Sequence, residues 1–185
     1  MKATGIVRRI DDLGRVVIPK EIRRTMRIRE GDPLEIYTDR EGEVIFKKYS
    51  PIGELSAFAS QYAETLYKTC GMAVLITDRD AVIAVAGASR KEYAERTLSD
   101  QMEKLMEGRG VYVWQEGSDK VYPTREATKE FVRCAMPIVS EGDVVGCVIS
   151  LGEGESSKAR EGLDGDVEAK LVQTAASFLG RQMES

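Results

Sequence analysis

The residues best suited to chemistry are the basic side chains of the first 29 positions. Nine basic residues stand there against three acidic ones, which gives this segment a charge of +6. The whole chain carries −4, so residues 30–185 carry −10. Seven of the nine are arginines, whose planar guanidinium donates paired hydrogen bonds to phosphate or to the edge of guanine. This division of charge indicates a polyanionic partner, and the chemistry is binding rather than bond-making.

Catalytic chemistry has few candidates in this sequence. Histidine is absent, which excludes Ser–His and Cys–His nucleophilic sites as well as histidine metal clusters. The three cysteines (Cys70, Cys134 and Cys147) are far apart and form no CxxC pair, so we expect reduced thiols in a cytoplasmic protein. Asp78 and Asp80 are neighbouring carboxylates, but they stand in a turn signature without a catalytic partner. We therefore expect no catalytic residue, no metal and no cofactor, and a protein that is not an enzyme.

Membrane insertion is also not expected. The apolar runs are short, as at residues 72–76, and the N-terminus lacks the apolar stretch of a signal peptide. These features predict a cytoplasmic protein with no membrane partner.

The basic residues are placed by short elements in residues 1–50. An Asp11–Gly14 turn joins two expected strands, and Pro19 ends the second strand and starts a short helix. A β-hairpin follows. The expected elements are strands 4–10 and 15–18, a helix at 20–26, and hairpin strands 34–38 and 43–47. In this arrangement, Arg8 and Arg15 flank one turn, while Arg23, Arg24 and Arg27 extend from one short helix.

A segment of this size is near the lower limit for independent folding. It contains no cysteine for a disulfide and no histidine for a metal site that could stabilise it. The sequence therefore predicts an obligate dimer through residues 1–50, and the alternative is that this segment packs on the rest of its own chain.

The remainder of the chain reads as one α+β module with an antiparallel sheet and flanking helices. We place a short linker and helix start at 51–55 and the module at 56–185. The expected elements are a helix to Gly71, strands 72–77 and 81–86, a helix from Ser89 to about 107, short strands 111–115 and 120–122, strands 131–139 and 143–151, and a helix 164–183. The first and last helices are amphipathic and could bundle with a second subunit, which predicts a homotetramer.

The motif Leu-Gly-Arg-Val-Val-Ile-Pro at residues 13–19, followed by Gly-Asp-Pro-Leu-Glu-Ile at 31–36, resembles the AbrB-type swapped-hairpin DNA-binding domain of bacterial transition-state regulators. The resemblance implies an all-β-rich barrel in which two chains interleave their hairpins. It implies that double-stranded DNA is contacted by Arg8, Arg15, Arg23 and Arg24, with Arg9, Lys20 and Lys2 as further candidates. Arg27 stands where many family members carry glycine.

Residues 134–139 and 142–149 resemble the paired strands of a GAF domain. This resemblance implies a possible pocket for an unidentified small-molecule effector, and the sequence does not identify its ligand-binding residues. Tyr112, Trp114 and Tyr122 are candidates to line it or to form core. Arg90, Arg109 and Arg133 are candidates to bind an anion or to remain solvated.

Together these features predict a DNA-binding transcriptional regulator of the sporulation and transition-state type, acting as activator or repressor at the nucleoid. The C-terminal module would sense a ligand or drive tetramerisation. The alternative is an antitoxin-like autoregulator whose C-terminal region binds a protein partner.

Overall fold

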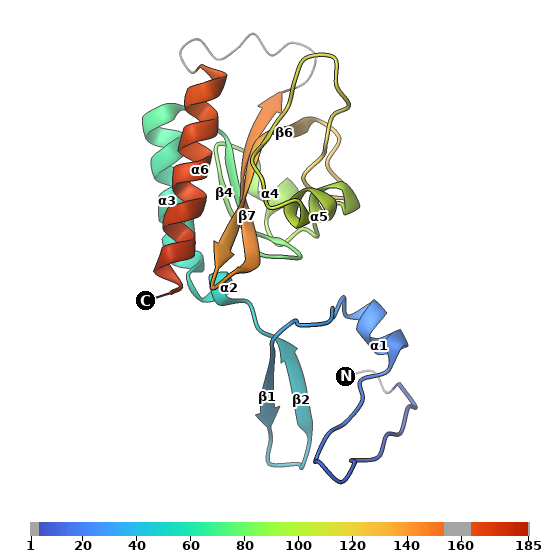
Figure 1. The fold of residues 1–185 in the computed structure, drawn as a ribbon. Coiled ribbons are helices and arrows are strands. Elements are labelled where there is room, and N and C mark those ends of the chain that lie inside the picture. The colour runs from blue at the N-terminus through green and yellow to red at the C-terminus, as the bar shows by residue number, and fades with distance from the viewer. Residues whose placement is uncertain (1–3, 154–163, 185) are drawn as a thin grey trace. The chain divides into compact units, whose positions relative to one another are not determined.

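The computed structural model describes residues 4–153 and 164–184. The chain divides into two compact units, Met1–Tyr49 and Ser50–Ser185, which we call the N-terminal and C-terminal units (Figure 1).

In the N-terminal unit, residues 4–49 form one short helix and one hairpin. The helix α1 spans Lys20–Thr25 directly after Pro19, whose fixed φ suits the residue that precedes a helix. Strands β1 (Leu34–Thr38) and β2 (Val44–Lys48) pair antiparallel, with Ile36 opposite Phe46. The predicted helix and hairpin are therefore confirmed, each to within about one residue.

The two strands predicted at 4–10 and 15–18 do not form in this single chain. Residues 4–19 contain a turn but no strand, and the sheet of this unit consists of β1 and β2 alone. The physical reason is that a strand persists only when its backbone groups pair with a neighbouring strand. The turn itself is present, because Gly14 N–H donates to the Asp11 carbonyl at 3.0 Å.

The C-terminal unit is built on a five-stranded antiparallel sheet in the order β4-β3-β7-β6-β5. Its elements are α2 (Pro51–Glu54), α3 (Ser56–Cys70), β3 (Val74–Thr77), β4 (Val82–Ala86), α4 (Arg90–Tyr93), α5 (Asp100–Glu107), β5 (Tyr112–Val113), β6 (Glu130–Ser140), β7 (Asp143–Glu153) and α6 (Gly165–Gln182). The long hairpin β6–β7 forms the centre, and α3 and α6 lie side by side over one face (Figure 1). The predicted α+β architecture is confirmed.

Alternation along the strands divides the core between the two faces of this sheet. Val74 and Ile76 of β3 pack with the buried residues of α3 and α6, whereas Leu75 between them packs with Met102 of α5. Both faces are therefore covered by helices, and the sheet is buried on both sides.

The helix predicted from Ser89 to about 107 is interrupted. It forms as α4 and α5, separated by a segment in which Thr97 bridges Ala81 and Leu98 bridges Thr124. Ser99 caps α5 by accepting the Met102 N–H at 3.1 Å, whereas Ser89 makes no capping bond. The tertiary bridges therefore override the local helical pattern. The strand predicted at 120–122 is likewise absent, although the Val121 carbonyl accepts a single bond from Val132 at 2.7 Å.

Candidate nucleic-acid interface

The basic residues singled out from the sequence lie on the surface of the N-terminal unit. Arg8, Arg9 and Arg15 are exposed around the Asp11–Gly14 turn. Lys20, Arg23 and Arg24 are exposed on α1. Lys2 lies outside the described residues. The described candidates are thus all accessible to a macromolecular anion.

One carboxylate, that of Asp11, organises the turn and its arginine. Asp11 Oδ1 accepts the backbone N–H groups of Leu13 at 3.0 Å and Arg15 at 2.7 Å, and Oδ2 binds Arg15 Nε at 2.8 Å. The Arg15 backbone bond, followed by its side chain, lowers the pKa of Asp11 below the ordinary value. The Arg15 side chain nevertheless stays 70% exposed, so its position is fixed while its surface remains available.

The basic residues of the helix α1 lie on the surface of the unit. None of its residues is buried, and Arg23 and Arg24 occupy its last turn. A hollow of about 400 Å³ on this surface is lined by Lys20, Glu21, Arg24 and Thr25. This arrangement can donate several guanidinium and ammonium N–H groups to phosphate oxygens.

Arg27, the residue that departs from the glycine expected by resemblance, has a left-handed backbone conformation. Arg27 follows the C-terminus of α1 with φ of +53°, in the left-handed region that glycine adopts most easily. Ile28 N–H then donates to the Arg23 carbonyl at 2.8 Å, which closes the helix end. Arg27 therefore adopts, at a cost in backbone strain, the left-handed conformation that ends α1.

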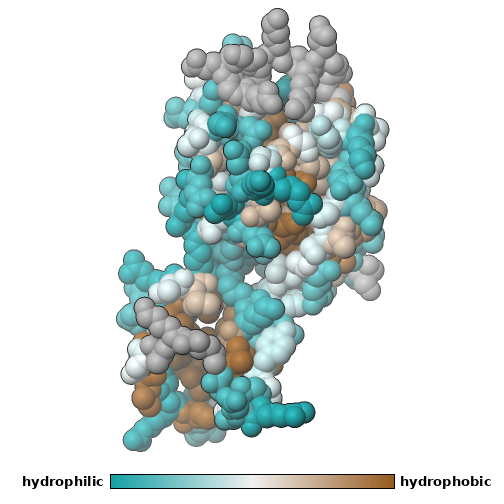
Figure 2. All heavy atoms as spheres, turned by 180° about the vertical axis from the view of Figure 1, so that it is seen from behind, coloured by the Kyte–Doolittle hydropathy of each residue, from teal (hydrophilic) through white to brown (hydrophobic). Residues whose placement is uncertain are grey.

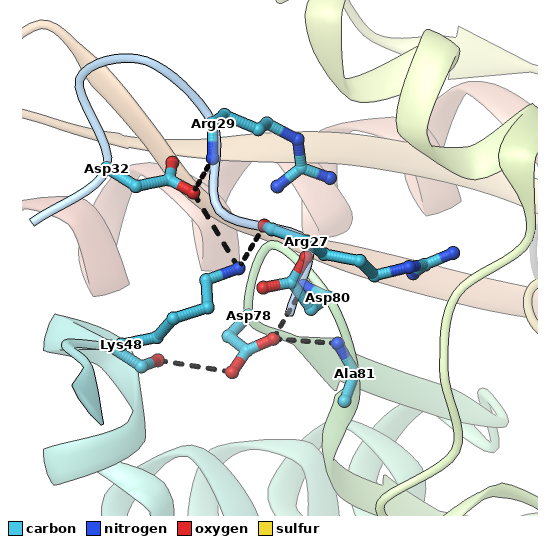
Figure 3. Close-up of polar contacts among 8 residues, drawn as sticks. Arg27, Arg29, Asp32, Lys48, Asp78, Asp80 and Ala81 are labelled. Carbon is cyan, nitrogen blue, oxygen red and sulfur yellow. Dashed lines mark hydrogen bonds and ion pairs between the residues drawn. The ribbon is translucent and has the colours of Figure 1, made fainter. Parts of the chain in front are cut away.

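A lysine of the hairpin ties this helix end in place (Figure 3). Lys48 Nζ donates to the Arg27 carbonyl at 2.8 Å and lies 3.7 Å from Asp32 Oδ2. The same Asp32 oxygen accepts the Arg29 backbone N–H at 2.8 Å. These contacts link the end of α1, the turn before β1 and the end of β2 into one local network.

The N-terminal unit also exposes much apolar surface, visible as brown areas on this unit in Figure 2. Val7 is 85% exposed, and Ile10, Leu13 and Val17 are each 70% exposed. Val7, Ile10 and Val17 belong to the segments that were predicted as strands, and Leu13 belongs to the turn between them. Extensive exposure of apolar side chains is typical of a surface that makes a protein–protein contact.

In the C-terminal unit, two of the candidate aromatic residues have structural contacts. Trp114 packs edge-on against Phe131 with ring centroids 4.8 Å apart, and its Nε1 donates to the Ser118 carbonyl at 3.1 Å. Tyr112 pairs with Ala135 in the β5–β6 ladder and packs against the buried cluster under α5. Tyr122 is half-buried.

Two of the candidate arginines are likewise engaged within the fold. Arg109 donates to the Gly142 carbonyl at 2.7 Å. Arg133 forms an ion pair with the buried Glu168 at 2.9 Å, which joins β6 to α6. Arg90 is exposed at the start of α4.

The acidic pair of the β3–β4 turn is also structural. Asp78 Oδ1 accepts the N–H groups of Asp80 and Ala81, both at 2.7 Å (Figure 3). Its Oδ2 accepts the Ser50 hydroxyl at 3.2 Å, and that hydroxyl in turn caps α2 by accepting Gly53 N–H. Asp78 therefore serves as the organising residue of a turn.

The cysteines are unpaired thiols, of which Cys134 and Cys147 are buried. Burial raises the pKa of Cys134 to about 12 and also raises that of Cys147. Across residues 4–153 and 164–184, no group of acidic or cysteine side chains could hold a metal ion. Within the same ranges, no helix is both long and apolar enough to cross a bilayer.

One set of side chains could not be found from sequence. Lys91, Arg96 and Lys129 line a hollow beside α4, although they come from two segments about 30 residues apart in the chain. No motif links these segments, so only the folded chain brings them together.

Comparisons with known proteins give a consistent assignment. A family model described as the C-terminal region of stage V sporulation protein T, a transcription factor, matches residues 54–184. A second model, described as the bacterial antitoxin MazE, antidote–toxin recognition, matches residues 7–53. The C-terminal unit also resembles a solved GAF domain/HD domain protein from Geobacter sulfurreducens at 16% identity and a TM-score of 0.50, over 75% of this chain and 99% of that one. This likeness confirms the GAF-like fold.

Two curated proteins of Bacillus subtilis cover the N-terminal unit. Transition state regulatory protein AbrB is 65% identical over 51 residues, which are 28% of this chain and 52% of that protein. Stage V sporulation protein T is 52% identical over 185 residues, which are 100% of this chain and 99% of that protein. The AbrB-like character of the first unit is thereby confirmed, and the chain belongs to the stage V sporulation protein T family.

Proposed function

We propose that the chain regulates transcription by binding double-stranded DNA through its N-terminal unit. The observation that carries the proposal is the group of exposed arginines around the Asp11–Gly14 turn and on α1. Arginine is the side chain best matched to phosphate and to guanine edges. Membership in a family described as transcription factors supports the same function.

We assign the DNA contacts to Arg8, Arg15, Arg23 and Arg24, with Arg9, Lys20 and Lys2 as additional contacts. Most of these would bind phosphate, which sets affinity, and a few would reach base edges, which sets specificity. Because Asp11 binds Arg15 through Nε, the two terminal nitrogens of this guanidinium would be left to contact DNA.

The DNA-binding form is a dimer in this proposal. A second copy of the chain would supply the missing strand partners for residues 4–19 and would cover the exposed Val7, Ile10, Leu13 and Val17. The resulting barrel would present both sets of arginines, with a charge of about +12 over residues 1–29 of the two chains.

A titration of labelled duplex DNA with the full chain tests this assignment. Arg15→Ala is expected to weaken binding by at least about tenfold, because each dimer loses two charged contacts. Arg40→Ala is the matched control, since Arg40 is also an exposed arginine of this unit but lies in the β1–β2 turn. Wild-type affinity for Arg15→Ala would contradict the assignment.

For the C-terminal unit we propose assembly of two dimers into a tetramer. Its α3 and α6 carry an aromatic group in which Phe178 lies 5.5 Å from the Tyr62 ring and 5.8 Å from the Phe58 ring. Phe178 and Val167, both on α6, remain exposed. A second pair of helices packed on this stripe would bury it, and tethering two DNA-binding dimers would raise avidity.

Light scattering tests the tetramer. Phe178→Glu is expected to halve the mass of the assembly, because a charge in an apolar contact is unfavourable. Ser177→Glu, at the neighbouring exposed position of α6, is expected to leave the mass unchanged. A wild-type protein with the mass of a dimer would refute this part of the proposal.

The antitoxin alternative is supported by the model match at residues 7–53. It requires a C-terminal segment that wraps a protein partner. Residues 50–185 instead form a folded unit with apolar cores on both faces of its sheet. We therefore favour a regulator in which this unit assembles the protein or responds to a ligand.

A further inference from the structure

A hollow of about 200 Å³ lies in the C-terminal unit between α4 and the segment before β6. Its volume equals that of about seven water molecules, and it is smaller than the pockets of drug-sized ligands. Any occupant is therefore a small molecule or one end of a larger one.

The hollow is lined in part by one buried aromatic residue, Tyr93. Tyr93 is only 2% exposed and packs in the buried cluster with Leu98 and Met102. Burial, followed by the nearby Glu130 carboxylate, raises the pKa of the Tyr93 hydroxyl, and Glu130 Oε2 is buried without a hydrogen-bond partner among the described residues. The Tyr93 ring is therefore part of the core, while most of the other residues that line the hollow are charged.

The lining of the hollow carries more positive than negative charge. Three cations stand there against two carboxylates, and the set comprises Lys91, Arg96, Lys129, Glu92 and Glu126. Arg96 lies 3.0 Å from Glu126, and Lys129 lies 3.9 Å from Glu92. Each pair joins the region of α4 to the segment before β6. All four side chains are roughly half exposed or more, so each pair contributes little to stability.

The backbone beneath Arg96 is fixed, in contrast to these weak pairs. Glu95 has φ of +61°, a conformation that is strained for a residue with a side chain. Its N–H donates to the Val82 carbonyl and the Arg96 carbonyl accepts the Val82 N–H, both at 3.0 Å. β4 thus holds Arg96 at the hollow, where its guanidinium can exchange one carboxylate for another anion.

We propose that this hollow binds the anionic group, carboxylate or phosphate, of a small molecule between Arg96 and Lys129. The anion replaces Glu126 and Glu92 as the partner of these two cations, and Lys91 adds a third positive charge. The idea that this binding makes the C-terminal unit a sensor rests on the proposed function. Binding of the anion itself does not require DNA.

Calorimetric titration of the full chain, without DNA, tests the site with two probes, succinate and inorganic phosphate. Wild-type protein is expected to bind at least one of them saturably, at one site per chain. Arg96→Ala is expected to weaken binding by about tenfold or more, the effect of one lost charge-assisted bond. Arg125→Ala is the matched control, because Arg125 pairs with Asp100 at 2.8 Å outside the hollow.

A second variant separates a specific site from general attraction. Glu126→Gln frees Arg96 and is expected to tighten binding by about two- to fivefold. Equal losses in the two arginine variants, no gain in Glu126→Gln, or no saturable binding of either probe overturns the proposal. DNA titration of the same proteins reports separately on the N-terminal unit, so the failure of one assignment is distinguishable from that of the other.

Discussion

Arg23→Ala isolates the electrostatic part of DNA binding. Arg23 lies in the last turn of α1, where no helical residue is buried, and its side chain is exposed. Alanine retains the backbone bonds of Arg23 and is the best helix former, so the unit keeps its fold. The substitution therefore removes a charge from the surface with little other change.

The magnitude follows from counting charges. If each dimer directs Arg8, Arg15, Arg23 and Arg24 to phosphates, it makes about eight contacts, which gives a salt dependence of log K with a slope of about −7. Arg23→Ala removes two of these contacts, so the slope becomes shallower by about 1.8. Extrapolated from 1 M to 0.1 M salt, this change corresponds to an affinity loss of about 60-fold.

Fluorescence anisotropy with labelled duplex DNA at several salt concentrations measures both quantities. Arg40→Ala, the exposed arginine of the β1–β2 turn, is expected to retain the wild-type slope. Circular dichroism should give equal unfolding temperatures for both variants and the wild type. An unchanged slope for Arg23→Ala, or the same change for Arg40→Ala, would refute the reasoning.

Further expectations concern the turn, the helix contact and the thiols. The pKa of Asp11 is lowered on folding, so its contribution to stability is present above its unfolded value, 3.8, and is lost as pH falls toward the folded value; the stability difference between wild type and Asp11→Ala, from denaturant unfolding, should shrink below about pH 4. Gly180→Ala should destabilise the protein by about 1–3 kcal/mol, because its Cβ would overlap a β6 carbonyl oxygen, whereas Gly165→Ala meets open space and should not destabilise it in thermal unfolding. Cys134 and Cys147 are buried and their thiol pKa values are raised, so mass spectrometry should detect their alkylation only after unfolding.

Local sequence patterns identified the elements that depend on neighbouring residues. The helix after Pro19, the hairpin of β1 and β2, and the helix start within 51–55, which Ser50 caps, all appear at the expected positions. Each depends on a fixed φ, a period of two or a capping bond, which are properties of a few adjacent residues.

Longer-range pairing accounts for the differences. The helix expected from Ser89 is broken because Thr97 and Leu98 bridge to Ala81 and Thr124. The segments expected as strands at 4–10 and 15–18 have no partner strand among the described residues of one chain. A pattern in one segment contains no information about which distant backbone will satisfy its hydrogen bonds.

The sequence by itself determined the basic N-terminal segment, the order of the main elements and the absence of histidine chemistry, because these follow from residue type and short spacing. Only the tertiary structure decided the roles of individual charges. It assigned Arg15 to Asp11, Arg133 to the buried Glu168, and Arg96 to the lining of a hollow. The physical reason is that the function of a charge depends on which groups and how much water surround it, and the fold sets both.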